Sequence, residues 1–342
     1  MTISIQTSTV HRATHHTGAT ETARRKTPAR IAPVLLAGTF SLLAGSAFAA
    51  GCGKGHDPGR YTLEIKSGGQ ARQIVYFVPS SYDGAKKLPA VFDFHGSTST
   101  GNEQLSRSEW ERVAEREGLI AVAPQGLMAG AKPDTFSWNV PGVTKPGGPD
   151  DMAFIKDAIA AMKETVCLDE QKLYGTGYSG GGRLLSQFIC NGNTDFAAAG
   201  FVVGLRAGYP RQEGDRWVPD TQSCKPAKPL SFIAFAGRQD KINPYDGGGQ
   251  PYWQYGAEAA LQRWVDLDGC TEKPESVTDK TVTVRRWTCN GKARIAAYVI
   301  SDAGHTWPAS TALLQYQQVL GKISYAVNAT DEMWSFFKQA TP

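Results

Sequence analysis

The chain has 342 residues, of which 41% are hydrophobic and 20% are charged, and its formal net charge is +4. This composition excludes a disordered tail and a membrane protein, and it is typical of a globular protein with a large core. Residues 1–49 hold five of the 36 Lys and Arg residues and one of the 32 Asp and Glu residues, which leaves 31 of each in the remainder. A neutral remainder gives no electrostatic reason to expect nucleic acid or an anionic membrane as a partner.

The first 49 residues have the pattern of a secretory signal peptide. A basic region around Arg24-Arg25 precedes an apolar run from Val34 to Ala44, and small residues follow at Ala47-Phe-Ala49. Signal peptidase cuts after such an Ala-x-Ala pattern, and the apolar run is short for a bilayer span of about 20 residues. We therefore expect a signal peptide at 1–49 and a secreted protein, extracellular or periplasmic, with no membrane association after cleavage. Acylation of Cys52 and export through the twin-arginine route stay open as alternatives.

The remainder alternates between strand-like and helix-like stretches. Residues 61–65 and 73–78 are separated by turn residues and predict an antiparallel hairpin. Apolar runs typical of buried parallel strands then recur at 90–94, 119–123, 172–177, 199–203, 230–235 and 294–300. Helix-like stretches lie at 108–117, 150–165, 182–190 and 331–339. This order predicts an α/β fold, in which a mostly parallel sheet has helices on both faces, and residues 50–342 form a single catalytic domain.

A glycine-rich turn at Gly177-Tyr-Ser-Gly-Gly181 follows a predicted strand and precedes a predicted helix. That context is the one in which a Gly-x-Ser-x-Gly motif forms a nucleophile elbow. Small residues permit the tight turn that exposes the Ser179 hydroxyl, and the Gly180 amide can help to bind an oxyanion at the helix N-terminus. We predict that Ser179 is a nucleophile.

A serine nucleophile needs a histidine as base and an acid that orients the histidine. When the serine lies on a Gly-x-Ser-x-Gly turn, the acid comes next in the chain and the histidine follows the acid. His305 is the only histidine downstream of Ser179, and it follows the last predicted strand. Asp240, a few residues beyond the strand at 230–235, is the expected acid. Asp246 precedes glycines and Asp302 is close to His305 in sequence, and both remain alternatives.

A His-Gly turn after the strand at 90–94 is the expected source of the second oxyanion donor. The Ser97 N–H is the candidate, together with the N–H of Gly180. His95 precedes the nucleophile, and we expect it to order this loop through hydrogen bonds rather than to act as the base.

All six cysteines lie in the predicted mature part: Cys52, Cys167, Cys190, Cys224, Cys270 and Cys289. An even number in an exported chain favours disulfides over metal sites, but six cysteines allow 15 pairings. Cys270 and Cys289 flank a predicted hairpin, which a disulfide between them would close. No metal site and no cofactor is expected.

Taken together, several short motifs resemble one known group of enzymes. They include Phe94-His-Gly, Gly177-Tyr-Ser-Gly-Gly-Gly, Gly237-Arg-Gln-Asp and Gly304-His-Thr-Trp-Pro. The chain resembles the secreted esterases of carbohydrate esterase family 1, including type B feruloyl and acetylxylan esterases, and polyhydroxybutyrate depolymerase-type esterases. The resemblance implies an α/β-hydrolase fold, a triad of Ser179, Asp240 and His305, and disulfides Cys52–Cys167, Cys190–Cys224 and Cys270–Cys289.

The expected function is hydrolysis of a carboxylic ester through an acyl-enzyme, with feruloyl or acetyl esters of plant polysaccharides as substrates. Polyester depolymerisation is the alternative within the same class, although Ser97 stands where depolymerase-type members often have Cys. A non-catalytic secreted binding protein on the same scaffold is the alternative from another class. Tyr178, Trp138 and Trp307 are the candidates for substrate contacts.

Overall fold

The computed structural model describes residues 50–140, 147–249, 251–270 and 274–340. The expected signal peptide at 1–49 lies outside the described residues. Internal contacts group Ala47–Pro342 into one compact unit, and the description below concerns this unit.

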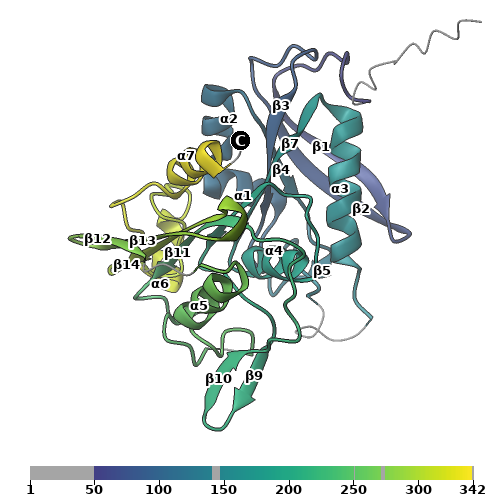
Figure 1. Ribbon diagram of the computed structural model, residues 1–342. Coiled ribbons are helices and arrows are strands. Elements are labelled where there is room, and N and C mark those ends of the chain that lie inside the picture. The colour runs from purple at the N-terminus through teal and green to yellow at the C-terminus, as the bar shows by residue number, and fades with distance from the viewer. Residues whose placement is uncertain (1–49, 141–146, 250, 271–273, 341–342) are drawn as a thin grey trace, which may run out of the picture. The chain divides into compact units, whose positions relative to one another are not determined.

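One large mixed sheet forms the centre of the unit (Figure 1). Its strands, in spatial order, are β1 (Gly59–Ser67), β2 (Gln70–Val78), β4 (Ile120–Pro124), β3 (Leu88–Phe94), β7 (Leu168–Tyr178), β8 (Ala198–Val202), β11 (Ser231–Gly237), β14 (Arg294–Ile300), β13 (Val282–Thr288) and β12 (Glu275–Asp279). The six strands from β4 to β14 are parallel to one another. Antiparallel pairs complete both edges, with β1–β2 on one side and β13–β12 on the other.

Helices cover both faces of the sheet. They are α1 (Gly101–Ser108), α2 (Trp110–Glu117), α3 (Asp151–Thr165), α4 (Gly180–Cys190), α5 (Ala257–Leu267), α6 (Gln317–Leu320) and α7 (Ala329–Ala340). Buried side chains of α3, α4 and α5 belong to the core on one face, and those of α1, α2 and α7 to the core on the other (Figure 1). Because both faces are covered, a strand such as β4 is buried at every position. This is the α/β arrangement that the sequence pattern predicts, and it agrees with the α/β-hydrolase fold that the family resemblance implies.

Several elements differ from the predicted ones. The expected helix at 108–117 starts at Trp110, because Glu109 has a left-handed backbone with φ 56° and separates it from α1. Thr100 caps α1 by accepting the N–H of Glu103 at 3.1 Å, a start signal that the pattern of apolar residues does not show. Two short antiparallel pairs were not expected: β5 (Met128–Ala129) with β6 (Phe136–Ser137), and β9 (Pro210–Glu213) with β10 (Arg216–Pro219).

Three disulfides join Cys52 to Cys167, Cys190 to Cys224 and Cys270 to Cys289. These are the pairs that the family resemblance implies. The first ties the N-terminal segment to the turn between α3 and β7, and the last closes the segment that contains β12 and β13. The pairing fits a protein that folds in an oxidising compartment.

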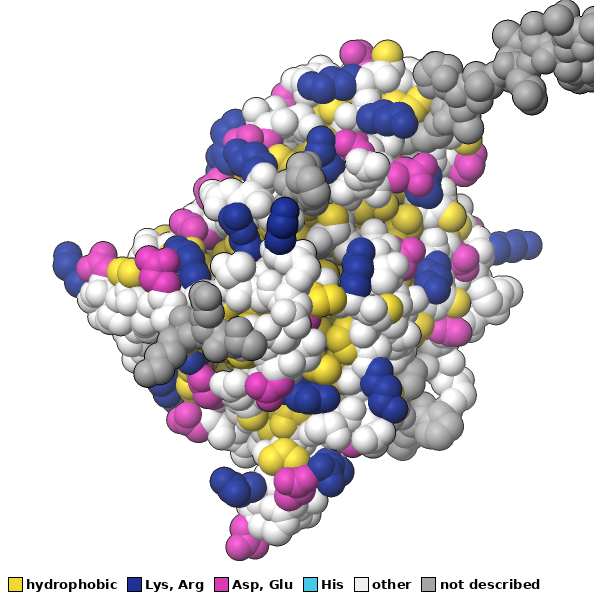
Figure 2. Space-filling view, viewed as in Figure 1, with side chains coloured by type: hydrophobic (Ala, Val, Ile, Leu, Met, Phe, Trp, Pro, Cys, Tyr) yellow, Lys and Arg dark blue, Asp and Glu magenta, His cyan; other side chains and the backbone are white. Residues whose placement is uncertain are grey.

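Charges of both signs are mixed on the face of the molecule that Figure 2 shows. On the described part of the face in Figure 2, Lys and Arg side chains lie among those of Asp and Glu. No helix in the described ranges has both the length and the apolar composition needed to cross a bilayer.

Candidate active site

Ser179 lies on a tight turn between the end of β7 and the start of α4. Its backbone has φ 51° and ψ −114°, a conformation that is strained for any residue except glycine. The Ser179 N–H donates to the carbonyl oxygen of Val202 at 2.9 Å, and its carbonyl accepts the N–H of Arg183 at 3.0 Å. Bonds to β8 on one side and to α4 on the other therefore hold the strained turn in place.

The glycines beside Ser179 allow the surrounding backbone to approach closely. A Cβ atom on Gly181 would overlap the carbonyl oxygen of Phe94. A Cβ atom on Gly177 would lie 2.6 Å from the carbonyl carbon of Gly181. Neither position accepts a larger residue without moving the backbone, so the turn requires glycine at both.

His305 connects Ser179 to Asp240 through two hydrogen bonds. Its Nε2 atom lies 2.7 Å from Ser179 Oγ, and its Nδ1 atom lies 2.7 Å from Asp240 Oδ2. A carboxylate can only accept, so Nδ1 carries the ring proton and Nε2 is left to accept the proton of the serine hydroxyl. The three residues are at most 8% exposed, which keeps bulk water away from these bonds.

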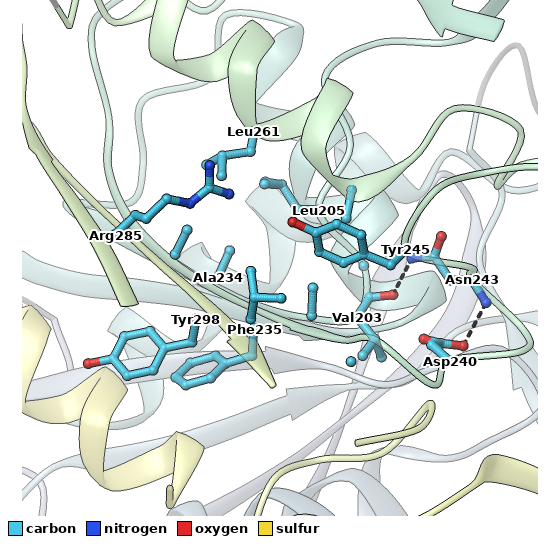
Figure 3. A pocket seen from close by; sticks show the side chains of 16 residues that line it. Val203, Leu205, Ala234, Phe235, Asp240, Asn243, Tyr245, Leu261, Arg285 and Tyr298 are labelled. Atoms are coloured by element: carbon cyan, nitrogen blue, oxygen red, sulfur yellow. Dashed lines mark hydrogen bonds between the residues drawn. The ribbon is translucent and has the colours of Figure 1, made fainter. Parts of the chain in front are cut away.

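The Asp240 carboxylate is held toward His305 by backbone amides. Its Oδ1 atom accepts the N–H groups of Ile242 and Asn243, each at 2.8 Å. The Asn243 side chain in turn donates to the carbonyl oxygen of Val203 at 2.8 Å (Figure 3). Asp240 therefore uses one oxygen for its own loop and presents the other to the imidazole.

The two alternative acids lie elsewhere. The Asp246 side chain is 87% exposed and faces Arg238 at 3.6 Å. Asp302 forms an ion pair with Lys322 at 2.5 Å. The structure thus brings Asp240, and neither alternative, to the histidine.

Figure 3 shows a small cavity beside Asp240, and Ser179 is not among the residues that line it. It measures about 30 Å³, and its mostly apolar lining includes residues of β11 and β14 together with Tyr245 and Arg285. Its size leaves room for about one water molecule, not for a substrate.

Ser97 and Gly180 lie side by side next to the serine. A Cβ atom on Gly180 would overlap Ser97 Oγ and lie 3.0 Å from Ser97 N, and one on Gly96 would lie 3.5 Å from the Cβ atom of Ser179. The Gly180 N–H belongs to the first turn of α4, where amides have no acceptor within the helix. The two residues expected to form the oxyanion hole therefore lie beside each other at the turn that carries Ser179.

His95 orders the loop that carries Ser97. Its Nδ1 atom donates to the carbonyl oxygen of Gly96 at 2.7 Å, while Nε2 accepts the N–H of Gly126 at 2.9 Å. Burial lowers the pKa of His95 to about 3, so the ring is neutral near neutral pH. This arrangement matches the expected role of His95 in ordering the loop.

A cavity of about 710 Å³ lies over Ser179 and His305. It is large enough to bury an aromatic acyl group or a sugar ring. Besides the serine, the histidine and Ser97, its lining includes aromatic and cationic side chains: Tyr178, Tyr252, Trp253, Tyr316, Arg60, Arg107, Lys132 and Arg183.

The three aromatic residues proposed for substrate contact have different positions. Tyr178 lines the cavity, and its hydroxyl donates to the carbonyl oxygen of His305 at 2.5 Å. Trp138 is fully buried and donates to the carbonyl oxygen of His95, and Trp307 is 1% exposed and donates to Thr330 Oγ1. Neither tryptophan lines the cavity, which corrects the expectation that they contact substrate. Both indole N–H groups are already satisfied inside the core.

Sequence comparison finds several esterases among curated proteins. The chain is 26% identical over 246 residues to feruloyl esterase B of Piromyces equi, covering 68% of the chain and 42% of that protein. It is 26% identical over 289 residues to feruloyl esterase C of Emericella nidulans, covering 80% and 89%. Probable feruloyl esterase C of Aspergillus niger is 24% identical over 305 residues, covering 85% and 91%. The chain thus spans less than half of the Piromyces protein and most of the other two. No protein-family model matches it.

The chain is similar in sequence to feruloyl esterases, and these relatives support a carboxylic ester hydrolase. Its fold is also that of solved esterase structures. Acetyl xylan esterase from Aspergillus awamori superposes with a TM-score of 0.52 at 14% identity, covering 76% of the chain and 99% of that protein.

The buried arginines of the cavity are not predicted by the sequence pattern. Arg107 and Arg183 lie in helical stretches, where an arginine ordinarily faces solvent. Both are buried instead, at 8% and 6% exposed. The position of Arg183 in the sequence could have predicted its place in the site, because it follows Ser179 by about one helical turn.

Proposed function

We propose that the esterase acts through an acyl-enzyme on Ser179, with His305 as general base and acid and Asp240 as the group that orients it. The observation that supports this most is the continuous pair of 2.7 Å hydrogen bonds from Ser179 Oγ to Asp240 Oδ2. In the first step Ser179 Oγ attacks the ester carbonyl carbon and its proton moves to His305 Nε2. The resulting oxyanion accepts hydrogen bonds from the Ser97 and Gly180 amides.

Collapse of this tetrahedral intermediate breaks the bond to the alcohol oxygen, which leaves with the proton from His305 Nε2. Water then attacks the acyl-enzyme carbonyl while His305 takes one of its protons. The second tetrahedral intermediate releases the carboxylic acid, and the proton returns to Ser179 Oγ.

A fluorophosphonate probe tests the assigned nucleophile. The wild-type protein should gain one label, mapped by mass spectrometry to the peptide that contains Ser179, and Ser179→Ala should gain none. Labelling of another residue would reject the assignment of the nucleophile and leave the esterase activity to be explained by that residue.

For the substrate, we propose feruloyl or acetyl esters of plant polysaccharides. The support is the similarity to feruloyl esterases together with a cavity large enough for an aromatic acid or a sugar. The test compares release of ferulate from methyl ferulate, of acetate from acetylated xylan and of hydroxybutyrate from its polymer.

Polyester hydrolysis is a second candidate because apolar side chains are exposed at the edge of the cavity. Tyr316 and Val319 line it and are 36% and 74% exposed, and the adjacent Leu314 is 53% exposed. Such residues suit contact with an apolar polymer surface. Faster release of hydroxybutyrate than of ferulate or acetate would favour this candidate.

We also propose that residues 1–49 are a signal peptide and that the enzyme works outside the cytoplasm. The Ala-x-Ala pattern at 47–49 and the three disulfides support this. Amino-terminal sequencing of exported protein should begin at Ala50.

A further inference from the structure

Arg183 is a buried cation in the wall of the active-site cavity. It lies in the first turn of α4, four residues after Ser179, and the residue is 6% exposed. The guanidinium stacks on the ring of Tyr252, with 4.2 Å from Cζ to the ring centroid. Arg183 and Ser179 both line this cavity, so the cation and the nucleophile face the same space.

The charge of Arg183 is not balanced by an acid in the described part of the chain. None of the ion pairs between described residues includes Arg183. Burial lowers its pKa to about 10, which reflects the cost of removing the cation from water.

Another buried arginine of the same chain shows the contrast. Arg72 is 2% exposed and also lies over an aromatic ring, that of Phe154, at 3.6 Å. It donates to Asp151 Oδ1 at 2.6 Å, a carboxylate that is as buried as the arginine. Where a buried arginine is purely structural, a pairing of this kind is the expected arrangement. Arg183 has the aromatic ring without the carboxylate.

The surroundings of Arg183 increase the positive potential further. Arg206, which is 4% exposed, lies near Arg183. Its guanidinium donates to the carbonyl oxygen of Tyr255 and to Asn243 Oδ1, and the Asp240 carboxylate attracts it. Among the described residues that line the cavity, Glu103 supplies the one carboxylate, and it accepts from Ser99 Oγ at 2.6 Å. Of the other cations that line the cavity, Arg60 pairs with Glu111. Arg107 donates to the neutral oxygens of Gln104 and Ser99, and Lys132 lies over the ring of Tyr316.

We propose that Arg183 binds a carboxylate of the substrate and makes the enzyme selective for esters that carry a carboxylate close to the scissile bond. This inference rests on the proposed role of Ser179 as nucleophile. A guanidinium can donate two parallel hydrogen bonds to a carboxylate, and such charge-assisted bonds are strongest where water is excluded. Bound substrate would then supply the anion that the protein itself does not place beside Arg183.

The carboxylate can belong to the acid or to the alcohol of the ester, and two pairs of substrates separate these sources. For the acid side, monomethyl glutarate is compared with methyl pentanoate, which has the same number of carbon atoms in its acyl chain and no charge. For the alcohol side, acetylated galacturonic acid is compared with acetylated galactose. In at least one pair, kcat/KM of the wild-type enzyme should be about tenfold or more higher for the charged ester.

Three variants assign the preference to Arg183. Arg183→Met should lower the charged-to-neutral ratio of kcat/KM by about tenfold or more, and Arg183→Lys should restore part of it because it keeps the charge without the planar fork. Arg211→Met removes the same charge from exposed β9, and its ratio should equal that of the wild type. Circular dichroism establishes that each variant is folded.

The outcomes separate this inference from the proposed function. Equal rates on charged and neutral esters in both wild-type pairs would overturn the inference, whether or not Arg183→Met folds. An unchanged ratio in folded Arg183→Met would also overturn it. No hydrolysis of any ester by wild-type protein that folds correctly would instead reject the proposed nucleophile and its mechanism.

Discussion

The two oxygens of the Asp240 carboxylate accept hydrogen bonds from different groups. One oxygen accepts two backbone amides of its loop, and the other accepts the Nδ1 proton of His305. An amide at this position keeps its oxygen on the two backbone N–H groups and so turns its NH₂ group toward the imidazole. His305 Nδ1 must then accept a hydrogen bond, the ring proton moves to Nε2, and the base that Ser179 needs is lost.

Asp240→Asn should therefore lower kcat by on the order of a thousandfold or more near neutral pH, with a smaller effect on KM. Steady-state kinetics on a soluble ester measure this. Asp246→Asn and Asp302→Asn are matched controls, because their carboxylates face Arg238 and Lys322, and each should cost less than about tenfold. If either control is the inactive variant, the assignment of the acid is wrong.

His95 provides a prediction about pH and stability. Burial lowers its pKa from 6.5 to about 3, so below pH 6.5 the unfolded chain binds a proton that the folded chain does not. The contribution of His95 to the free energy of unfolding is therefore complete above pH 6.5. It is lost as the pH falls toward 3, by up to about 1.4 kcal/mol per pH unit.

His95→Gln should reduce this dependence, measured as the slope of the unfolding free energy from urea titrations between pH 4 and 6.5. Asp93, whose pKa burial raises to about 6, acts in the opposite direction over the same range, but it is present in both proteins and cancels in the difference. Parallel pH curves for the wild type and the variant would contradict the prediction.

At the scale of elements, the six parallel strands are predictable because burial on both faces requires nearly continuous apolar residues. The helix at 150–165 is predictable from its acidic start, and Asp150 indeed caps α3 by accepting the N–H of Ala153. By contrast, α1 has Leu105 as its one large apolar residue, and β5 and β6 have two residues each. Such elements are specified by contacts with distant parts of the chain, which local pattern does not record.

The residues of the site also differ in how far the sequence predicts them. Ser179 is recognisable from its motif, and His305 from its position after a strand. The buried state of Arg183 and Trp138 depends on how loops distant in sequence close over them. A sequence pattern treats the first as a surface charge and the second as a loop aromatic.

Two disulfides offer a comparison between elements. Cys52–Cys167 joins residues 115 apart, and Cys270–Cys289 joins residues 19 apart. A disulfide lowers the chain entropy of the unfolded state, and this effect increases with the length of the loop that it closes. The expected contribution to the unfolding free energy is about 5 kcal/mol for the first disulfide and about 3 kcal/mol for the second. Replacing both cysteines of the first pair by Ser should therefore lower the unfolding free energy more than replacing those of the second. Guanidinium titration of the two double variants measures this, and the reverse order would show that local strain or residual structure outweighs loop length.

For the whole molecule, the disulfides and the proposed export make one joint prediction. Each bridge contributes about 3–5 kcal/mol through loop closure, and a protein of this kind has a total unfolding free energy of about 5–15 kcal/mol. The chain should therefore depend on an oxidising compartment to reach a stable fold.

Exported protein should contain no thiol that reacts after denaturation without reductant, and it should be active. Chain produced without export in a reducing cytoplasm should contain free thiols and have a lower thermal midpoint. Equal midpoints for the two preparations, with thiols present in one, would show that the core alone stabilises the fold.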